Sequence, residues 1–201
     1  MTPIATASSA RGGQVTYTRT ICWWNMERGF ITVVSGLPRS GTSMLMKMLE
    51  AGGIPPLTDH ARRPDEDNPR GYYEFERVKG LPDDTEWLPE ARGKAVKILA
   101  ELVTKLPPDY RYKVIFIHRN IDEILASQRK MILRRGGDPD VVSDDDLRAL
   151  FQKYVRILRS WIDKQPHVDV LNLHYNEIIE DPTGAVHAMN EFLGGDLDTD
   201  K

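Results

Sequence analysis

The segment ITVVSGLPRSGTSMLMKMLEAGG, from Ile31 to Gly53, is the most informative part of the sequence. Its apolar start is typical of a strand buried on both faces of a parallel sheet, which we expect at residues 30–35. Gly36 and Gly41 follow with four residues between them, the glycine spacing of a phosphate-binding P-loop. A helix is then expected at residues 40–51, ended by a pair of glycines. The segment therefore predicts a strand, a glycine-rich turn and a helix in that order.

The turn between that strand and that helix has the composition of an anion site. Successive backbone N–H groups and the positive end of the helix dipole would point at one spot. Ser40, Thr42 and Ser43 would add hydroxyl donors there. Thr42 stands where nucleotide-hydrolysing P-loops carry a lysine, while Arg39 lies inside the loop. The alternative is that the two glycines serve only to make a tight turn.

A second departure from nucleotide-hydrolysing proteins lies at the end of another apolar strand, residues 112–118 (YKVIFIH). In those proteins a strand-end aspartate helps to hold Mg²⁺. Here the strand is followed by Arg119 and Asn120, with no acidic residue. Hydrolysis of a nucleoside triphosphate is therefore disfavoured.

Strands and helices alternate along the rest of the chain. A helix is expected after Asn120, at residues 121–135, and a long amphipathic helix at 144–164, with Ser143 as its cap. Residues 168–173 form a third predicted strand, and Pro182 begins a helix capped by Asp181. The pattern predicts an α/β fold in which a doubly wound parallel sheet carries helices on both faces.

Composition limits the domain organisation and the partners. The 201 residues are 40% hydrophobic and 28% charged, which is typical of one globular domain. We expect residues 1–28 to be a disordered extension and 29–201 to be a single domain. The net charge of −3 provides no general basic field for nucleic acid, and we expect no membrane span. The single cysteine, Cys22, favours a reduced, cytoplasmic setting.

Three segments together carry a family resemblance. LPRSGTS, residues 37–43, resembles the loop with which sulfotransferases bind the 5′-phosphosulfate of their donor, 3′-phosphoadenosine 5′-phosphosulfate (PAPS). FIHRNIDEILASQRKM, residues 116–131, resembles the family's 3′-phosphate motif, with Arg119 and Ser127 at the matching positions. LNLHYNEIIEDP, residues 171–182, resembles a third family segment, with Tyr175 at the aromatic position. The chain is thus similar to P-loop-like, bacterial-type short sulfotransferases.

The resemblance implies a function and a donor site. It implies transfer of a sulfuryl group from PAPS to a hydroxyl or amine acceptor, without a metal ion, leaving adenosine 3′,5′-bisphosphate (PAP). Arg39 would stabilise charge on the bridging oxygen as the sulfuryl group leaves. The donor-binding residues implied are Pro38, Arg39, Ser40, Gly41, Thr42, Ser43, Arg119, Ser127 and Tyr175. The residues alone leave a second role open for Arg119, a surface ion pair with Asp122.

The irregular segment after the first helix, DEDNPRGYYEFERVKGL, is where the resemblance places a general base. Glu74 is the first candidate and Glu76 the second. The alternative is that Tyr72, Tyr73 and Phe75 pack this segment while Glu74 points to water. Lys94 and Lys97, further along, fit either contact with an acidic acceptor or, preferably, exposure to solvent.

Some features depart from the family pattern and keep other functions open. Met44 stands at the position of a large stacking residue, and a basic C-terminal segment that closes over the 3′-phosphate has no counterpart before Lys201. Donor binding would then be weak, or the chain would be a shortened version of a longer one. A P-loop kinase of a small metabolite and a non-catalytic nucleotide-binding protein remain alternatives. The acceptor and the oligomeric state stay open.

Overall fold

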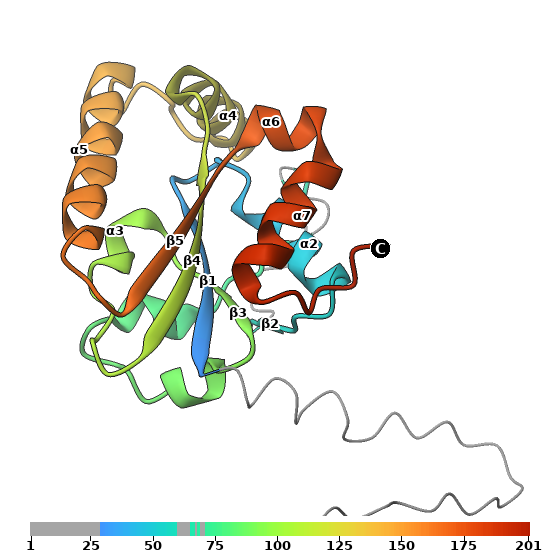
Figure 1. Cartoon of the computed structure of the whole chain (residues 1–201). Helices are drawn as coiled ribbons and strands as arrows, with labels where there is room; N and C mark the ends of the chain where they lie inside the picture. The colour runs from blue at the N-terminus through green and yellow to red at the C-terminus, as the bar shows by residue number, and fades with distance from the viewer. Residues whose placement is uncertain (1–28, 60–64, 67, 69–70) are drawn as a thin grey trace, which may run out of the picture.

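A five-stranded parallel sheet forms the centre of the molecule (Figure 1). The computed structural model describes residues 29–59, 65–66, 68 and 71–201. The strand order is β2-β3-β1-β4-β5, and all four neighbouring pairs are parallel. The strands are β1 (Phe30–Gly36), β2 (Pro56–Leu57), β3 (Ala95–Lys97), β4 (Arg111–His118) and β5 (Val168–His174). The predicted doubly wound α/β fold is confirmed.

Helices cover both faces of the sheet (Figure 1). Helices α2, α6 and α7 pack on one face, while α3, α4 and α5 pack on the other. Their bounds are α2 (Thr42–Ala51), α3 (Ala100–Val103), α4 (Ile121–Arg134), α5 (Asp144–Ile162), α6 (Tyr175–Glu180) and α7 (Pro182–Leu193). Two 3₁₀ helices, η1 (Glu76–Gly80) and η2 (Leu88–Ala91), belong to the α5 side.

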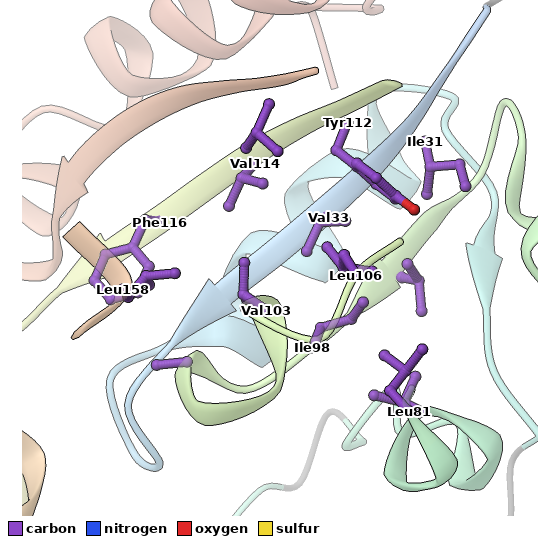
Figure 2. Close-up of a cluster of buried hydrophobic side chains, with 14 of the residues drawn as sticks. Ile31, Val33, Leu81, Ile98, Val103, Leu106, Tyr112, Val114, Phe116 and Leu158 are labelled. Atoms are coloured by element: carbon purple, nitrogen blue, oxygen red, sulfur yellow. The ribbon is translucent and has the colours of Figure 1, made fainter. Parts of the chain in front are cut away.

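Side chains of the central strands alternate between two hydrophobic clusters. Val33 of β1 and Phe116 of β4 point towards the α5 side, where they join Leu158 in the cluster drawn in Figure 2. Their neighbours Val34 and Ile117 join the cluster under α2 and α7. Because both faces are covered, the central strands are apolar almost throughout, which explains why they could be recognised in the sequence.

The order of the strands places a crevice at the carboxyl end of β1. From β1 the chain moves to β2 and β3 on one side, and then crosses to β4 on the other side. Where the direction of winding reverses in this way, the loops leaving adjacent strands separate and leave room for a ligand. The glycine-rich loop leaves β1 at this point.

The elements that differ from the sequence predictions are mostly short. Helix α2 begins at Thr42 instead of residue 40, because Gly41 is its N-cap with a φ of 108°, outside helical geometry. Strands β2 and β3, of two and three residues, are too short to show alternation. Helix α6 follows β5 directly, without a turn residue to announce it. The predicted caps Ser143 and Asp181 are confirmed by side-chain bonds to backbone N–H groups. The extension predicted at 1–28 lies outside the described residues.

Candidate active site

The loop between β1 and α2 is compact because both of its glycines lie against other atoms. A Cβ on Gly36 would come within 2.4 Å of Oγ of Ser40, and one on Gly41 within 2.7 Å of the Tyr175 ring. Arg39, between them, has a φ of 67°, a left-handed conformation that is uncommon for a residue with a side chain. Such strain persists only where the surroundings hold it, and it concentrates at binding sites.

A cavity of about 530 Å³ opens in front of this loop. Its size is in the range of small-molecule sites. The cavity brings together all of the donor-binding and base candidates except Ser40: Pro38, Arg39, Gly41, Thr42, Ser43, Glu74, Glu76, Arg119, Ser127 and Tyr175. Met44 also lines it. Four segments that lie far apart in the sequence therefore meet where the strand order leaves room for a ligand.

Ser40 is the exception because it supports the loop from beneath. Its side chain is fully buried, and its backbone N–H donates to the carbonyl oxygen of Leu37 at 3.1 Å. Within the described residues its hydroxyl has no hydrogen-bond partner, and it faces Gly36. The hydroxyl therefore does not line the cavity, contrary to what its place in the motif suggested.

Arg119 links the end of β4 to the loop. Its Nη1 donates to the carbonyl oxygen of Arg39 at 3.0 Å, and its Nε donates to Glu123 at 2.9 Å. Its guanidinium carbon lies 4.1 Å from the centre of the Tyr175 ring, a cation–π geometry. The ion pair envisaged with Asp122 is not formed, because Asp122 pairs with Arg148 instead.

Arg119 and Glu123 form a hydrogen-bonded ion pair. The hydrogen bond from Arg119 is the main cause that lowers the pKa of Glu123, followed by one from the Asn176 side chain. Glu123 therefore stays ionised and holds one edge of the guanidinium. Arg119 makes no further hydrogen bond within the described part of the chain, so its Nη2 can serve a ligand.

Arg39 and Ser127 are in direct contact. Nε of Arg39 donates to the Ser127 hydroxyl at 3.1 Å, although the two residues lie 88 positions apart. This contact places a residue of the loop motif beside a residue of the α4 motif. The two motifs thus belong to one site.

The segment that carries Glu74 is anchored on both sides of that residue. Tyr72 is buried, and the hydroxyl of Tyr73 donates to Glu50 of α2 at 2.6 Å. Phe75 packs edge-on against Trp87, with ring centres 5.5 Å apart. The aromatic residues thus do pack the segment, as the alternative proposed, but the Glu74 side chain lines the cavity and is only 28% exposed.

The Lys97 side chain is more buried than the sequence suggested. Its side chain is only 9% exposed, and Nζ lies 4.0 Å from Oε1 of Glu74. Nζ also donates to the carbonyl oxygen of Tyr72 at 2.6 Å and lies 3.4 Å from Oγ of Ser43. A solvated lysine would make none of these contacts. Lys97 is the last residue of β3, which pairs with β1 and so brings Lys97 near the loop, but β3 is too short to be recognised in the sequence.

Glu76 and Lys94 are placed differently from Glu74 and Lys97. Glu76 lines the cavity, but its carboxylate pairs with Lys79 at 2.7 Å and its side chain is 52% exposed. Lys94 pairs with Glu90 on the surface, at 3.2 Å. Of the two base candidates, Glu74 is therefore the less exposed and the one beside a buried cation.

Clusters of metal ligands and membrane-spanning helices are both absent from the described residues. Among them, no group of three or more histidine, cysteine, aspartate or glutamate side chains could hold a metal ion. No helix in the described ranges is long and apolar enough to cross a membrane.

Comparisons with known proteins give a family and a fold. The model of the sulfotransferase domain family matches residues 31–201. A sulfotransferase from Alicyclobacillus acidocaldarius is 18% identical, with a TM-score of 0.49 over 86% of this chain and 83% of its own. Mouse sulfotransferase SULT7A1 complexed with PAP is 18% identical, with a TM-score of 0.50 over 83% of this chain and 60% of the mouse chain. The likeness to the mouse structure shows a shared fold, in a chain that spans about three fifths of the mouse protein. No curated protein matches the sequence.

The close approach of Gly41 to Tyr175 can be tested by the loss of stability when Gly41 is replaced by alanine. Gly53 has a φ of 94°, and a Cβ added there would meet nothing within 4 Å, so Gly53→Ala should cost only the backbone strain, about 1–2 kcal/mol. Gly41→Ala adds a clash with the Tyr175 ring and should lower the free energy of unfolding by clearly more. Urea denaturation of both variants measures the difference. Equal losses would contradict the packing of the loop against Tyr175.

Proposed function

The chain belongs to the sulfotransferase domain family, and on that premise we propose that it transfers a sulfuryl group from PAPS to a hydroxyl or amine acceptor. The observation that carries the proposal is the meeting of the loop, Arg119 and Glu74 around one cavity. PAPS supplies an activated sulfuryl group, and PAP is the leaving group.

The loop has the donor set that a terminal phosphate requires. The first N–H groups of α2 have no partner within the helix, and they lie at the positive end of its dipole. The Thr42 hydroxyl makes no hydrogen bond within the described residues, and Thr42 lines the cavity. We propose that these groups and Ser43 hold the 5′-phosphate of the donor.

Arg119 and Ser127 are the proposed contacts of the 3′-phosphate. Arg119 is held by Glu123 and Tyr175 in a fixed orientation, which favours a planar fork binding an oxyanion. The Ser127 hydroxyl accepts from Arg39 and keeps its own proton for donation to a ligand. Tyr175, which stacks on Arg119, forms the aromatic edge of the same site.

Arg39 and Glu74 are the proposed catalytic residues. The Arg39 guanidinium stabilises negative charge on the oxygen that bridges sulfur and the nucleotide as that bond breaks. Glu74 accepts the proton of the acceptor hydroxyl or amine as its oxygen or nitrogen bonds to sulfur. Lys97, 4.0 Å from Glu74, forms an ion pair with that carboxylate and places a second cation beside the loop at Ser43. No metal ion is required, because the transferred group carries less charge than a phosphoryl group.

Lys97 also bears on the kinase alternative. A P-loop kinase that lacks its loop lysine needs a compensating one, and Lys97 is near enough to Ser43 to fill that role. The end of β4 nevertheless offers His118, Arg119 and Asn120, none of which is an acidic ligand for Mg²⁺. Binding measurements therefore have to separate the two functions.

Calorimetry with two nucleotides tests the donor. PAP should bind, with an affinity unchanged by EDTA or Mg²⁺, and ATP should bind more weakly because it has no 3′-phosphate for Arg119. Arg119→Gln should weaken PAP binding by roughly 10-fold or more, through loss of a charge-assisted contact. Tight, Mg²⁺-dependent binding of ATP without binding of PAP would refute the proposed donor and favour a kinase.

Two substitutions separate catalysis from binding. Arg39→Ala and Glu74→Gln should lower turnover by about 10²–10⁴-fold while PAP still binds, because both act on the reacting groups. Turnover is measured with an acceptor found in a screen against PAPS. The matched control is Glu90→Gln, a surface change outside the cavity. A large loss in Glu76→Gln with full activity in Glu74→Gln would move the base to Glu76, and full activity in all variants would exclude the mechanism.

A further inference from the structure

A second cavity, of about 420 Å³, lies on the α5 side of the sheet. Leu37 from the loop and Phe116 from β4 contribute to its wall, and both belong to the hydrophobic cluster under α5. Gln152, Val155, Arg156 and Arg159 of α5 form the opposite wall. Of the residues that line it, only Arg119 has a part in the proposed transfer reaction, and that reaction uses no residue of α5.

The charged residues that line this second cavity are all basic. They are Arg119, Arg156 and Arg159, with His118 beside them, and no carboxylate of the described residues lines the cavity. This is a local concentration of positive charge in a chain whose net charge is −3. Such a cavity attracts anions, because its apolar walls strengthen the field of the guanidinium groups.

Arg156 and Arg159 are available to a ligand. Neither makes a hydrogen bond or ion pair with any residue that the structure describes, and both side chains are exposed along one side of α5. Arg148, further towards the start of the same helix, is instead neutralised by Asp122 at 2.6 Å. Arg119 is paired with Glu123, so the basic character of the cavity rests on Arg156 and Arg159.

Apart from Gln152, the rest of the lining is apolar, from Leu37, Phe116, Ile121 and Val155. Leu37 and Phe116 are 5% and 4% exposed, so they form a floor and not a rim. A ligand that fits this cavity carries an oxyanion that binds the arginine guanidinium groups and an apolar group that packs on Leu37 and Phe116. An inorganic anion would leave the floor uncovered.

We propose that this cavity binds a small amphiphilic oxyanion, an aryl or alkyl monoester of sulfate or phosphate. The sulfate ester is the favoured member, and that preference rests on the proposed function, because sulfuryl transfer to an alcohol or phenol yields such an ester. Arg119 lines both cavities, so an occupant here touches the residue that also joins the loop to β4. The second cavity is thus a site for product-like anions beside the donor site.

Calorimetry on the full chain saturated with PAP tests this site. The probes are 4-nitrophenyl sulfate, 4-nitrophenyl phosphate and the head-free 4-nitrophenol. Both esters should bind, and the sulfate should bind at least as tightly as the phosphate. The double variant Arg156→Gln/Arg159→Gln should weaken ester binding by roughly 10-fold or more, since two charged contacts are lost. The control Lys153→Gln removes an exposed charge of the same helix outside the cavity and should change ester affinity by less than about 2-fold.

The outcomes separate the site from the proposed transfer reaction. Ester binding that is absent, or that is equal in wild type and the double variant, overturns the site. Binding of 4-nitrophenol as tight as that of the esters also overturns it, because the arginines would then play no part. If the phosphate ester binds more tightly than the sulfate ester, the cavity is still an oxyanion site, and its ligands are phosphate esters. If the wild type fails to bind PAP, the donor proposal fails, and the same titrations without PAP still decide the second site.

Discussion

The hydrogen bond from Nη1 of Arg119 to the carbonyl oxygen of Arg39 holds the candidate site together. β1 and β4 pair in parallel up to Gly36 and Ile117, so the loop and Arg119 leave the sheet side by side. The bond ties the loop at the residue whose φ of 67° is least favourable, and Nε of the same Arg39 contacts Ser127. A bond that positions both guanidinium groups therefore sets where two negatively charged groups of a ligand can lie.

The part of the cavity wall that carries Glu74 depends on a second charged pair, between Lys97 and Glu74. Lys97 is nearly buried, and it is stabilised there by the carbonyl oxygen of Tyr72 and the Glu74 carboxylate. Burying an ammonium group without such partners would carry a large desolvation cost. The segment around Glu74 in turn depends on the aromatic anchors Tyr72 and Phe75, and on the bond from Tyr73 to α2. The position of Glu74 near the loop thus depends on aromatic residues that take no part in the reaction themselves.

Much of the fold could be predicted because the central strands are buried on both faces and read as continuous apolar runs. β1 and β4 were found for that reason, and Ser143 and Asp181 marked two helix starts through cap chemistry. β5 was also predicted, although it is an edge strand and only partly buried. β2 and β3 carry too few residues for a pattern, so the sequence could not show that Lys97 reaches the loop. Likewise, the motif could not show that the Ser40 hydroxyl turns beneath the loop, because that follows from its contact with Gly36.

We propose that the loop and the end of β4 hold the two phosphate groups of one nucleotide. A crystal structure of the PAP complex would show both contacts. We expect the 5′-phosphate within about 3 Å of the N–H groups of Thr42 and Ser43, and the 3′-phosphate at the same distance from Arg119 and Ser127. A nucleotide bound elsewhere, or bound in the reverse direction with its 3′-phosphate on the loop, would exclude this arrangement.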